Sequence, residues 1–172
     1  MILLVGCSAL NEPSIELTNT SVDIHIAEND IHYFDIPNQV EENLSTVSLR
    51  YNFSIKNTGN QTEDGLNYTI EPSEELLKTA IEILGFNLFD ESERAANSLG
   101  IGWSISPMLK KDEVGENYLD FELGVKEQID KIDQYNVAPS MEQLNTLKEN
   151  ALKSTLIVSV KGEELARFKL TD

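Results

Sequence analysis

Apolar and polar residues alternate without a break over residues 47–55. This period of two is typical of a strand with one face in the core and the other in water. After a polar loop at residues 57–65, a second alternation begins at Leu66 and continues through Tyr68 and Ile70. The spacing predicts two neighbouring strands of an antiparallel sheet. The apolar residues of the first strand are Val47, Leu49, Tyr51, Phe53 and Ile55.

Further strands are expected in short segments that are rich in β-branched and aromatic residues and are separated by turn-forming clusters. These segments are residues 14–26, 31–36, 101–106 and 118–124. Near the C-terminus, two alternating runs flank a tight turn at Gly162-Glu163, a pattern that predicts a hairpin. The apolar residues of its two arms are Leu156, Val158, Val160, Ala166, Phe168 and Leu170.

Two helices are predicted between these strands. Residues 73–84 have Ser73 in the N-cap position and Gly85 just past their end. Residues 140–152 begin with a capping box at Ser140. Each helix carries one apolar stripe, which faces the core by default and forms a partner-binding groove in the alternative interpretation.

Seven to nine short strands with two helices between them favour a mainly β fold. The expected architecture is an immunoglobulin-like antiparallel β-sandwich with two inserted helices. The chain lacks the Cys…Trp…Cys spacing of antibody domains, because it contains a single cysteine and a single tryptophan. A length of 172 residues suits one domain, and we expect residues 14–172 to form it.

The charge balance excludes one large class of partners. The chain has 30 acidic and 13 basic residues, which gives a formal charge of −17. A nucleic-acid-binding protein needs a cationic surface to displace the counterions of the phosphates, so we expect no nucleic acid among the partners. No stretch approaches the roughly 20 apolar residues of a membrane span.

The lone cysteine stands in the segment "LVGCSALNEP", directly behind a short apolar run. Leu4-Val5-Gly6-Cys7 resembles the lipobox of bacterial lipoproteins. The resemblance implies that Cys7 receives a diacylglyceryl group on its thiol, and that cleavage before Cys7 makes it the first mature residue. Residues 1–6 are then the remnant of a signal peptide, and residues 7–13 are the lipidated N-terminus and a tether.

The signal is incomplete as it stands, because no basic residue precedes Arg50 and only four apolar residues separate Met1 from Gly6. We therefore expect Met1 to lie inside a longer signal peptide. In the alternative interpretation, residues 1–6 form a first β-strand and Cys7 is buried behind it. The lipobox reading predicts a protein on the extracytoplasmic face of the cell membrane of a Gram-positive bacterium, with the membrane itself as a partner through the lipid.

Three longer segments carry a second resemblance. They are "LRYNFSIKNTGN", "LNYTIEPSEELLKTAIEILGF" and "STLIVSVKGEELARFKL". They are similar to parts of small extracytoplasmic lipoproteins of Bacillus-type bacteria whose function is not known. The likeness covers the chain from about residue 45 onward. It implies a sandwich domain outside the cytoplasm and brings no catalytic residue with it.

The sequence contains no recognisable catalytic or cofactor-binding motif. His25 and His32 lack the spacing of a zinc site, and no GxSxG motif surrounds any serine. We therefore expect no enzyme activity, no cofactor and no metal. The loop at residues 57–65 offers oxygen donors for calcium, although polar hairpin loops are common for solubility alone. Acidic residues that could pair for acid–base chemistry are too many to single out: Glu63, Asp64, Asp90, Glu91, Glu93, Asp112 and Glu113.

Two functions remain open. The first is a non-enzymatic lipoprotein that binds an envelope protein or polymer. The second is a small-molecule-binding or inhibitory lipoprotein with a pocket between the sheet and the helices. A pocket lined by Trp103 and tyrosines, with a few convergent polar groups, favours the second function. A filled core with an exposed apolar patch favours the first.

Overall fold

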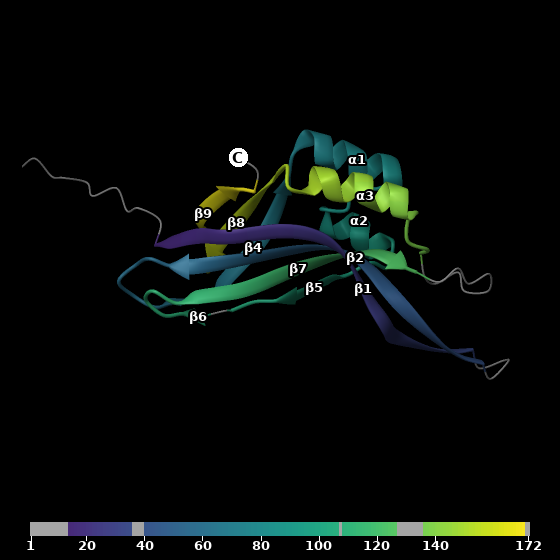
Figure 1. Cartoon of the computed structure of the whole chain (residues 1–172), viewed down its shortest axis with the longest axis horizontal. Helices are drawn as coiled ribbons and strands as arrows, with labels where there is room; N and C mark the ends of the chain where they lie inside the picture. The colour runs from purple at the N-terminus through teal and green to yellow at the C-terminus, as the bar shows by residue number, and fades with distance from the viewer. Residues whose placement is uncertain (1–13, 36–39, 107, 127–135, 171–172) are drawn as a thin grey trace, which may run out of the picture.

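The computed structural model describes residues 14–35, 40–106, 108–126 and 136–170 (Figure 1). The lipobox, Cys7 and the tether lie outside this range, so the expectations for residues 1–13 stay predictions. Within it the chain is mainly β, with antiparallel sheets and three helices. The predicted mainly β class is therefore confirmed.

Four antiparallel strands form the larger sheet, in the order β1-β2-β7-β5. Tyr51 of β2 lies opposite Val22 of β1 on one side and Leu119 of β7 on the other. This register puts apolar residues of three strands on one face of the sheet. The strands are β1 (Ile15–Asp35), β2 (Val40–Asn57), β5 (Ile101–Ser104) and β7 (Val114–Val125).

Three antiparallel strands form the second sheet, in the order β4-β8-β9. The turn between the last two strands consists of Lys161 and Gly162, which both have positive φ angles, as a two-residue hairpin turn requires. Two very short strands pair separately. The strands are β4 (Leu66–Pro72), β8 (Ser154–Val160) and β9 (Glu163–Lys169), with β3 (Glu63–Asp64) and β6 (Met108–Leu109) as the separate pair.

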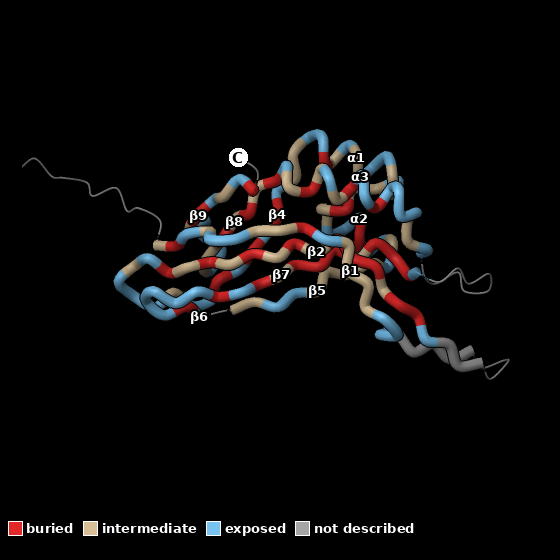
Figure 2. Tube along the Cα trace, in the orientation of Figure 1, coloured by how far each residue is buried: buried red, intermediate tan, exposed pale blue. Residues whose placement is uncertain are grey.

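The apolar faces of the two sheets share one core. Leu49, Tyr51, Phe53 and Ile55 of β2 are buried, while the polar residues between them are half-buried, as their alternation predicts. Figure 2 shows this change between buried and half-buried positions along the strand. Across the core, the ring centre of Phe53 lies 4.9 Å from that of Tyr68 in β4. A tilted aromatic pair at this distance adds attraction beyond the burial of its area.

Two of the three helices were predicted. α1 (Glu74–Leu84) has Ser73 as its N-cap, and α3 (Met141–Ala151) begins with the capping box of Ser140 and Gln143. Their buried residues, such as Leu76 and Leu144, join the core that the sheets form. α1 and α3 lie side by side (Figure 1). Most of the apolar stripe of each helix therefore faces the core, as expected by default, whereas Ile81 of α1 and Met141 of α3 are exposed.

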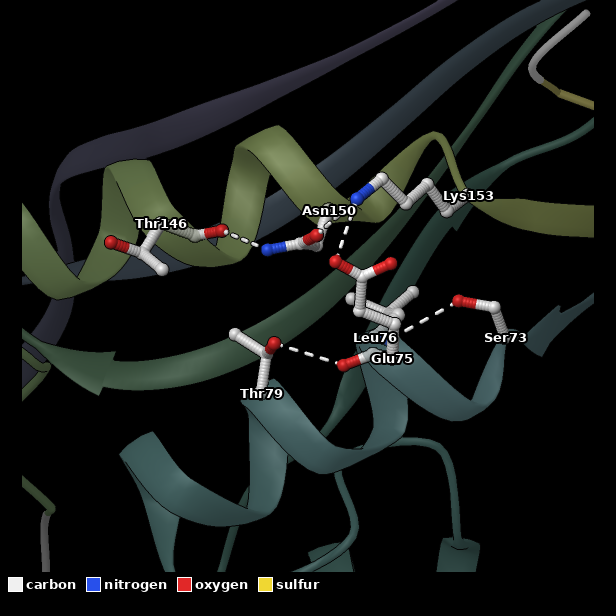
Figure 3. Close-up of polar contacts among 7 residues, drawn as sticks. All are labelled: Ser73, Glu75, Leu76, Thr79, Thr146, Asn150 and Lys153. Carbon is white, nitrogen blue, oxygen red and sulfur yellow. Dashed lines mark hydrogen bonds and ion pairs between the residues drawn. The ribbon is translucent and has the colours of Figure 1, made fainter.

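A short polar network joins α1 to the end of α3 (Figure 3). The ammonium group of Lys153 donates to Glu75 Oε1 at 2.8 Å and to Asn150 Oδ1 at 2.9 Å. The Ser73 hydroxyl accepts from the amide of Leu76 at 3.1 Å and caps α1. Because exposed ion pairs contribute at most about 1 kcal/mol, the buried apolar residues hold the two helices in place.

Tyr51 connects the larger sheet to the helical side of the core. Its hydroxyl donates to the carbonyl oxygen of Ala151 at 3.2 Å, and the Ser154 hydroxyl donates to the same oxygen at 2.7 Å. All three residues are buried. The contact fixes the point at which α3 ends and β8 begins, 100 residues along the chain from Tyr51.

Four details of the sequence interpretation were wrong. β2 and β4 are not neighbours in one sheet but belong to different sheets that face each other. Residues 14–26 and 31–36 do not form two strands, because β1 continues through a bulge between Ala27 and Ile31. A third helix, α2 (Glu91–Ala96), lies between α1 and β5. The last hairpin turns one residue earlier than predicted.

Gly124 provides a test of the packing at the end of β7. Its φ is +126°, and a Cβ built there would lie 2.4 Å from the carbonyl oxygen of Asn136. That oxygen accepts a hydrogen bond from the amide of Val125 at 2.8 Å. We expect Gly124→Ala to lower the free energy of unfolding by about 3 kcal/mol, because the side chain adds backbone strain and displaces this contact.

Gly102→Ala is the matched control for this measurement. A Cβ on Gly102 would meet its nearest neighbour, the Cβ of Asp120, at 3.4 Å, and the φ there is not positive. We expect a change below about 1 kcal/mol in urea unfolding. Equal losses in the two variants would show that the close approach at Gly124 is not what the fold requires.

Candidate ligand-binding groove

A groove of about 640 Å³ lies between β4 and β5. Each of these strands is an edge strand of its sheet, so the groove lies between the edges of the two sheets. α2 and the residues just before it form a further wall. The volume lies within the range of roughly 300–1,000 Å³ that is typical of small-molecule sites.

Aromatic side chains line the groove. The indole of Trp103 is 63% exposed, although its neighbour in the sheet, Leu119, is buried. Phe89 and Phe121 lie deeper, with ring centres 5.1 Å apart. A large apolar side chain that is held at the mouth of an aromatic groove, rather than packed inside, is typical of a binding surface.

Arg94 of α2 brings a positive charge to the groove. Its side chain is buried, with 6% of the residue exposed, and the guanidinium carbon lies 5.6 Å from the centre of the Phe121 ring. Nη1 donates to the carbonyl oxygen of Leu88 at 2.8 Å. Arg94 forms no ion pair with any carboxylate of the described residues. Burial lowers the pKa of its guanidinium, and Glu91 and Asp90 oppose that shift.

Tyr68 also lines the groove, and its hydroxyl is buried. Tyr68 is 6% exposed, and its hydroxyl oxygen has no hydrogen-bond partner within the described part of the chain. Burial raises the pKa of Tyr68 to about 12. A buried hydroxyl without a partner destabilises a fold by about 1–3 kcal/mol, so its removal should not weaken the fold.

The groove combines residues that the sequence suggested with one that it did not. The predicted pocket with Trp103 and a tyrosine is present, but its wall is α2 rather than α1 or α3. Arg94 was missed because α2 was missed. The signal was available, since Asp90 is followed three positions later by Glu93, and Asp90 Oδ1 accepts from the amides of Ser92 and Glu93 as an N-cap.

Two of the side chains that could offer oxygen to calcium in the loop at residues 57–65, Asn57 and Glu63, make hydrogen bonds within the protein instead. Asn57 is fully buried, and its Nδ2 donates to the carbonyl oxygens of Gln61 and Leu109 at 2.7 and 2.9 Å. Glu63 Oε1 instead accepts from Ser14 at 2.7 Å. The loop side chains therefore hold the chain in shape by bonds within the protein.

Three of the seven acidic residues that were considered for catalysis, Asp90, Glu93 and Glu113, accept hydrogen bonds from nearby backbone amides. Glu113 Oε2 accepts from the amide of Lys110 at 2.8 Å, and Glu93 Oε2 accepts from the amide of Asn87 at 2.6 Å. Hydrogen bonds from Ser92 and Glu93 lower the pKa of Asp90. Over the ranges that the structure describes, no three His, Cys, Asp or Glu side chains gather as a metal site would require. The structure describes the backbone of His32 but not its side chain, so His32 is not included in this statement.

Comparisons with family models, curated proteins and solved structures return no match for this chain. None of the helices among the described residues is long and apolar enough to cross a membrane. Trp103, Tyr68 and Arg94 all line the groove between β4 and β5.

Tyr51 and Tyr68 provide a matched test of the unpartnered hydroxyl. Tyr51→Phe removes a hydrogen bond and should lower the free energy of unfolding by about 1 kcal/mol. Tyr68→Phe removes a hydroxyl that has no partner, so stability should stay equal or rise by up to about 1 kcal/mol. Urea unfolding at neutral pH measures both changes. A loss in Tyr68→Phe as large as that in Tyr51→Phe would mean that the hydroxyl of Tyr68 is bonded.

The same two residues predict a loss of stability in alkali. Below about pH 10 both hydroxyls are protonated in the folded and the unfolded chain. Above it the unfolded chain releases these protons, while the folded chain retains that of Tyr68 until its pKa of about 12. Between those values deprotonation lowers the free energy of the unfolded state relative to the folded state, so stability falls as the pH rises. Tyr68→Phe should reduce this fall, and an unchanged pH profile would contradict the assignment.

Proposed function

We propose that the protein is an extracytoplasmic lipoprotein, held at the cell membrane by a lipid on Cys7, that binds a component of the cell envelope in the groove between β4 and β5. The observation that carries the proposal is the exposed Trp103 at the mouth of a groove that also holds the buried Arg94, which forms no ion pair with a carboxylate of the described residues. Aromatic and arginine side chains are enriched where proteins bind one another.

We also propose that the fold is an immunoglobulin-like sandwich, and the strand order supports it. When the two short strands β3 and β6 are left out, the seven others can be lettered A to G in chain order. The two sheets then read A-B-E-D and C-F-G. This is the arrangement of constant-type immunoglobulin domains. α1 and α2 then fall in the C–D connection, and α3 falls in the E–F connection.

A second candidate function is the binding of a small molecule, with an inhibitory role among its forms. The volume of the groove suits it, and Arg94 is a charged group that can fix the orientation of an anionic ligand. Neither function includes catalysis. Asp90, just before α2, accepts from the amides of Ser92 and Glu93 and from the hydroxyl of Ser92, which is the bonding of a helix N-cap.

The lipid anchor is tested at Cys7. One acyl chain holds a protein at a membrane only reversibly, whereas two hold it stably, at ~0.8 kcal/mol per buried methylene. Expressed behind a complete signal in a Gram-positive host, the wild-type protein should take up labelled palmitate and partition into detergent. Cys7→Ser should remain unlabelled and be shed or retained as a precursor. Equal solubility without label in both would show that Cys7 is an ordinary thiol.

The groove is tested with two exposed apolar residues of similar exposure. Trp103 is 63% exposed beside the groove, and Met141 is 57% exposed at the start of α3. We expect photo-crosslinking in intact host membranes to yield an adduct with the wild-type protein and with Met141→Ser, and to yield it at least about tenfold less with Trp103→Ser. Equal yields from the two variants would place the binding surface elsewhere.

A further inference from the structure

We propose that the occupant of the groove is an extended segment of a partner protein, which adds to β5 as a further antiparallel strand. This inference rests on the proposed function, in which the groove is the binding site. Two features specify the occupant: the backbone groups at the edge of β5, and the positive charge of Arg94 in α2. Addition of a strand to an open sheet edge is a recurrent mode of peptide recognition.

The backbone of β5 has groups that face away from β7 and that pair with no backbone group of the described residues. The amide of Glu122 donates to the carbonyl oxygen of Gly100 at 3.2 Å, which makes this a hydrogen-bonded pair. In an antiparallel ladder such pairs alternate, so Gly102 and Ser104 also face β7. The N–H and C=O groups of Ile101 and Trp103 therefore face outward, where an added strand can pair with them.

The edge of β5 also lacks the charges that protect other edges. β1 and β9 end their sheets on the opposite side, and both carry charged residues along their length. Residues 97–108, by contrast, contain no Asp, Glu, Lys or Arg, although a quarter of the chain is charged. Charged residues on an edge strand discourage pairing with other chains. Their absence around β5 leaves this edge open to pairing.

The side chains of the groove determine what the added strand carries. Arg94 lies over the ring of Phe121, which pairs with Ile101, whereas Trp103 stands two residues further along β5. In an antiparallel strand, the residue opposite Trp103 precedes the residue opposite Ile101 by two positions. We therefore expect an apolar residue, then any residue, then an aspartate or glutamate whose carboxylate pairs with the guanidinium of Arg94.

A second copy of this chain does not fit the site as well as such a segment does. Each copy has a formal charge of −17, so two copies repel each other at low salt. An edge-to-edge pair of two β5 strands would also bring residues 97–108 together, and this stretch contains no carboxylate for Arg94. A partner segment with one acidic residue provides the carboxylate for Arg94 and does not bring a second charge of −17 to the site.

The sole tryptophan allows a direct binding test on the full chain. The probe is an acetylated and amidated peptide of alternating threonine and valine that carries leucine and, two positions later, aspartate. We expect it to shift the emission of Trp103 to shorter wavelength and to saturate. Asparagine in place of aspartate should weaken binding by about tenfold or more, because a charge-assisted bond is lost. Reversing the order of leucine and aspartate should weaken it similarly.

Methylation of single peptide amides separates strand addition from other binding. The leucine and aspartate amides of the probe would pair with Trp103 and Ile101, whereas the amide between them would face away. N-methylation of either outer amide should abolish binding, and N-methylation of the central amide should leave it unchanged within about twofold. Because only the peptide changes, the fold of the protein is the same in every titration.

Three results would overturn the inference. The first is no emission shift with the parent peptide at millimolar concentration. The second is equal binding of all the N-methylated peptides. The third is sedimentation of the free chain as a dimer whose Trp103 emission moves to longer wavelength on dilution, which would make a second copy the occupant. None of these results affects the comparison of Trp103→Ser with Met141→Ser, so the proposed function can stand when this inference fails.

Discussion

The rings of Phe53 and Tyr68 meet across the core with their centres 4.9 Å apart, and the rest of the molecule follows from this contact. The contact joins β2 and β4, which belong to opposite sheets. Each sheet is open, so it has two edge strands: β1 and β5 in the larger sheet, and β4 and β9 in the smaller one. The helices lie in connections between the two sheets: α1 and α2 between β4 and β5, and α3 between β7 and β8. On one side, the edge strands β4 and β5 leave the groove open between them.

Phe121 and Tyr68 line the groove and also pack in the core. Phe121 packs against Tyr51 in the core, with ring centres 5.9 Å apart, and also lies beneath Arg94. Tyr68 packs on Phe53 while its hydroxyl remains without a partner among the described residues. A site of this kind is rigid, because its walls are held by the core. Its wall also contains Arg94, whose guanidinium forms no ion pair with a carboxylate of the described residues.

The sequence was informative where a local pattern determines the structure. Alternation predicted the strands, and the caps at Ser73 and Ser140 placed α1 and α3 within a residue or two. Alternation specifies which residues share a face but not which strand lies alongside, so β2 and β4 were wrongly paired. α2 has six residues, too few for a helical period to appear, and Arg94 went unnoticed with it. Trp103 was foreseen, and the lipid on Cys7 stays a prediction.

The most direct test of the open edge is residue-resolved hydrogen exchange of the four amides of β5 in the full chain. The account predicts fast exchange at Ile101 and Trp103, because their amides face outward, and slow exchange at Gly102 and Ser104, which face β7. Saturation with the leucine–aspartate peptide should then slow exchange at Ile101 and Trp103 alone. Slow exchange at all four amides in the free protein would mean that the edge is already covered, and would contradict the account.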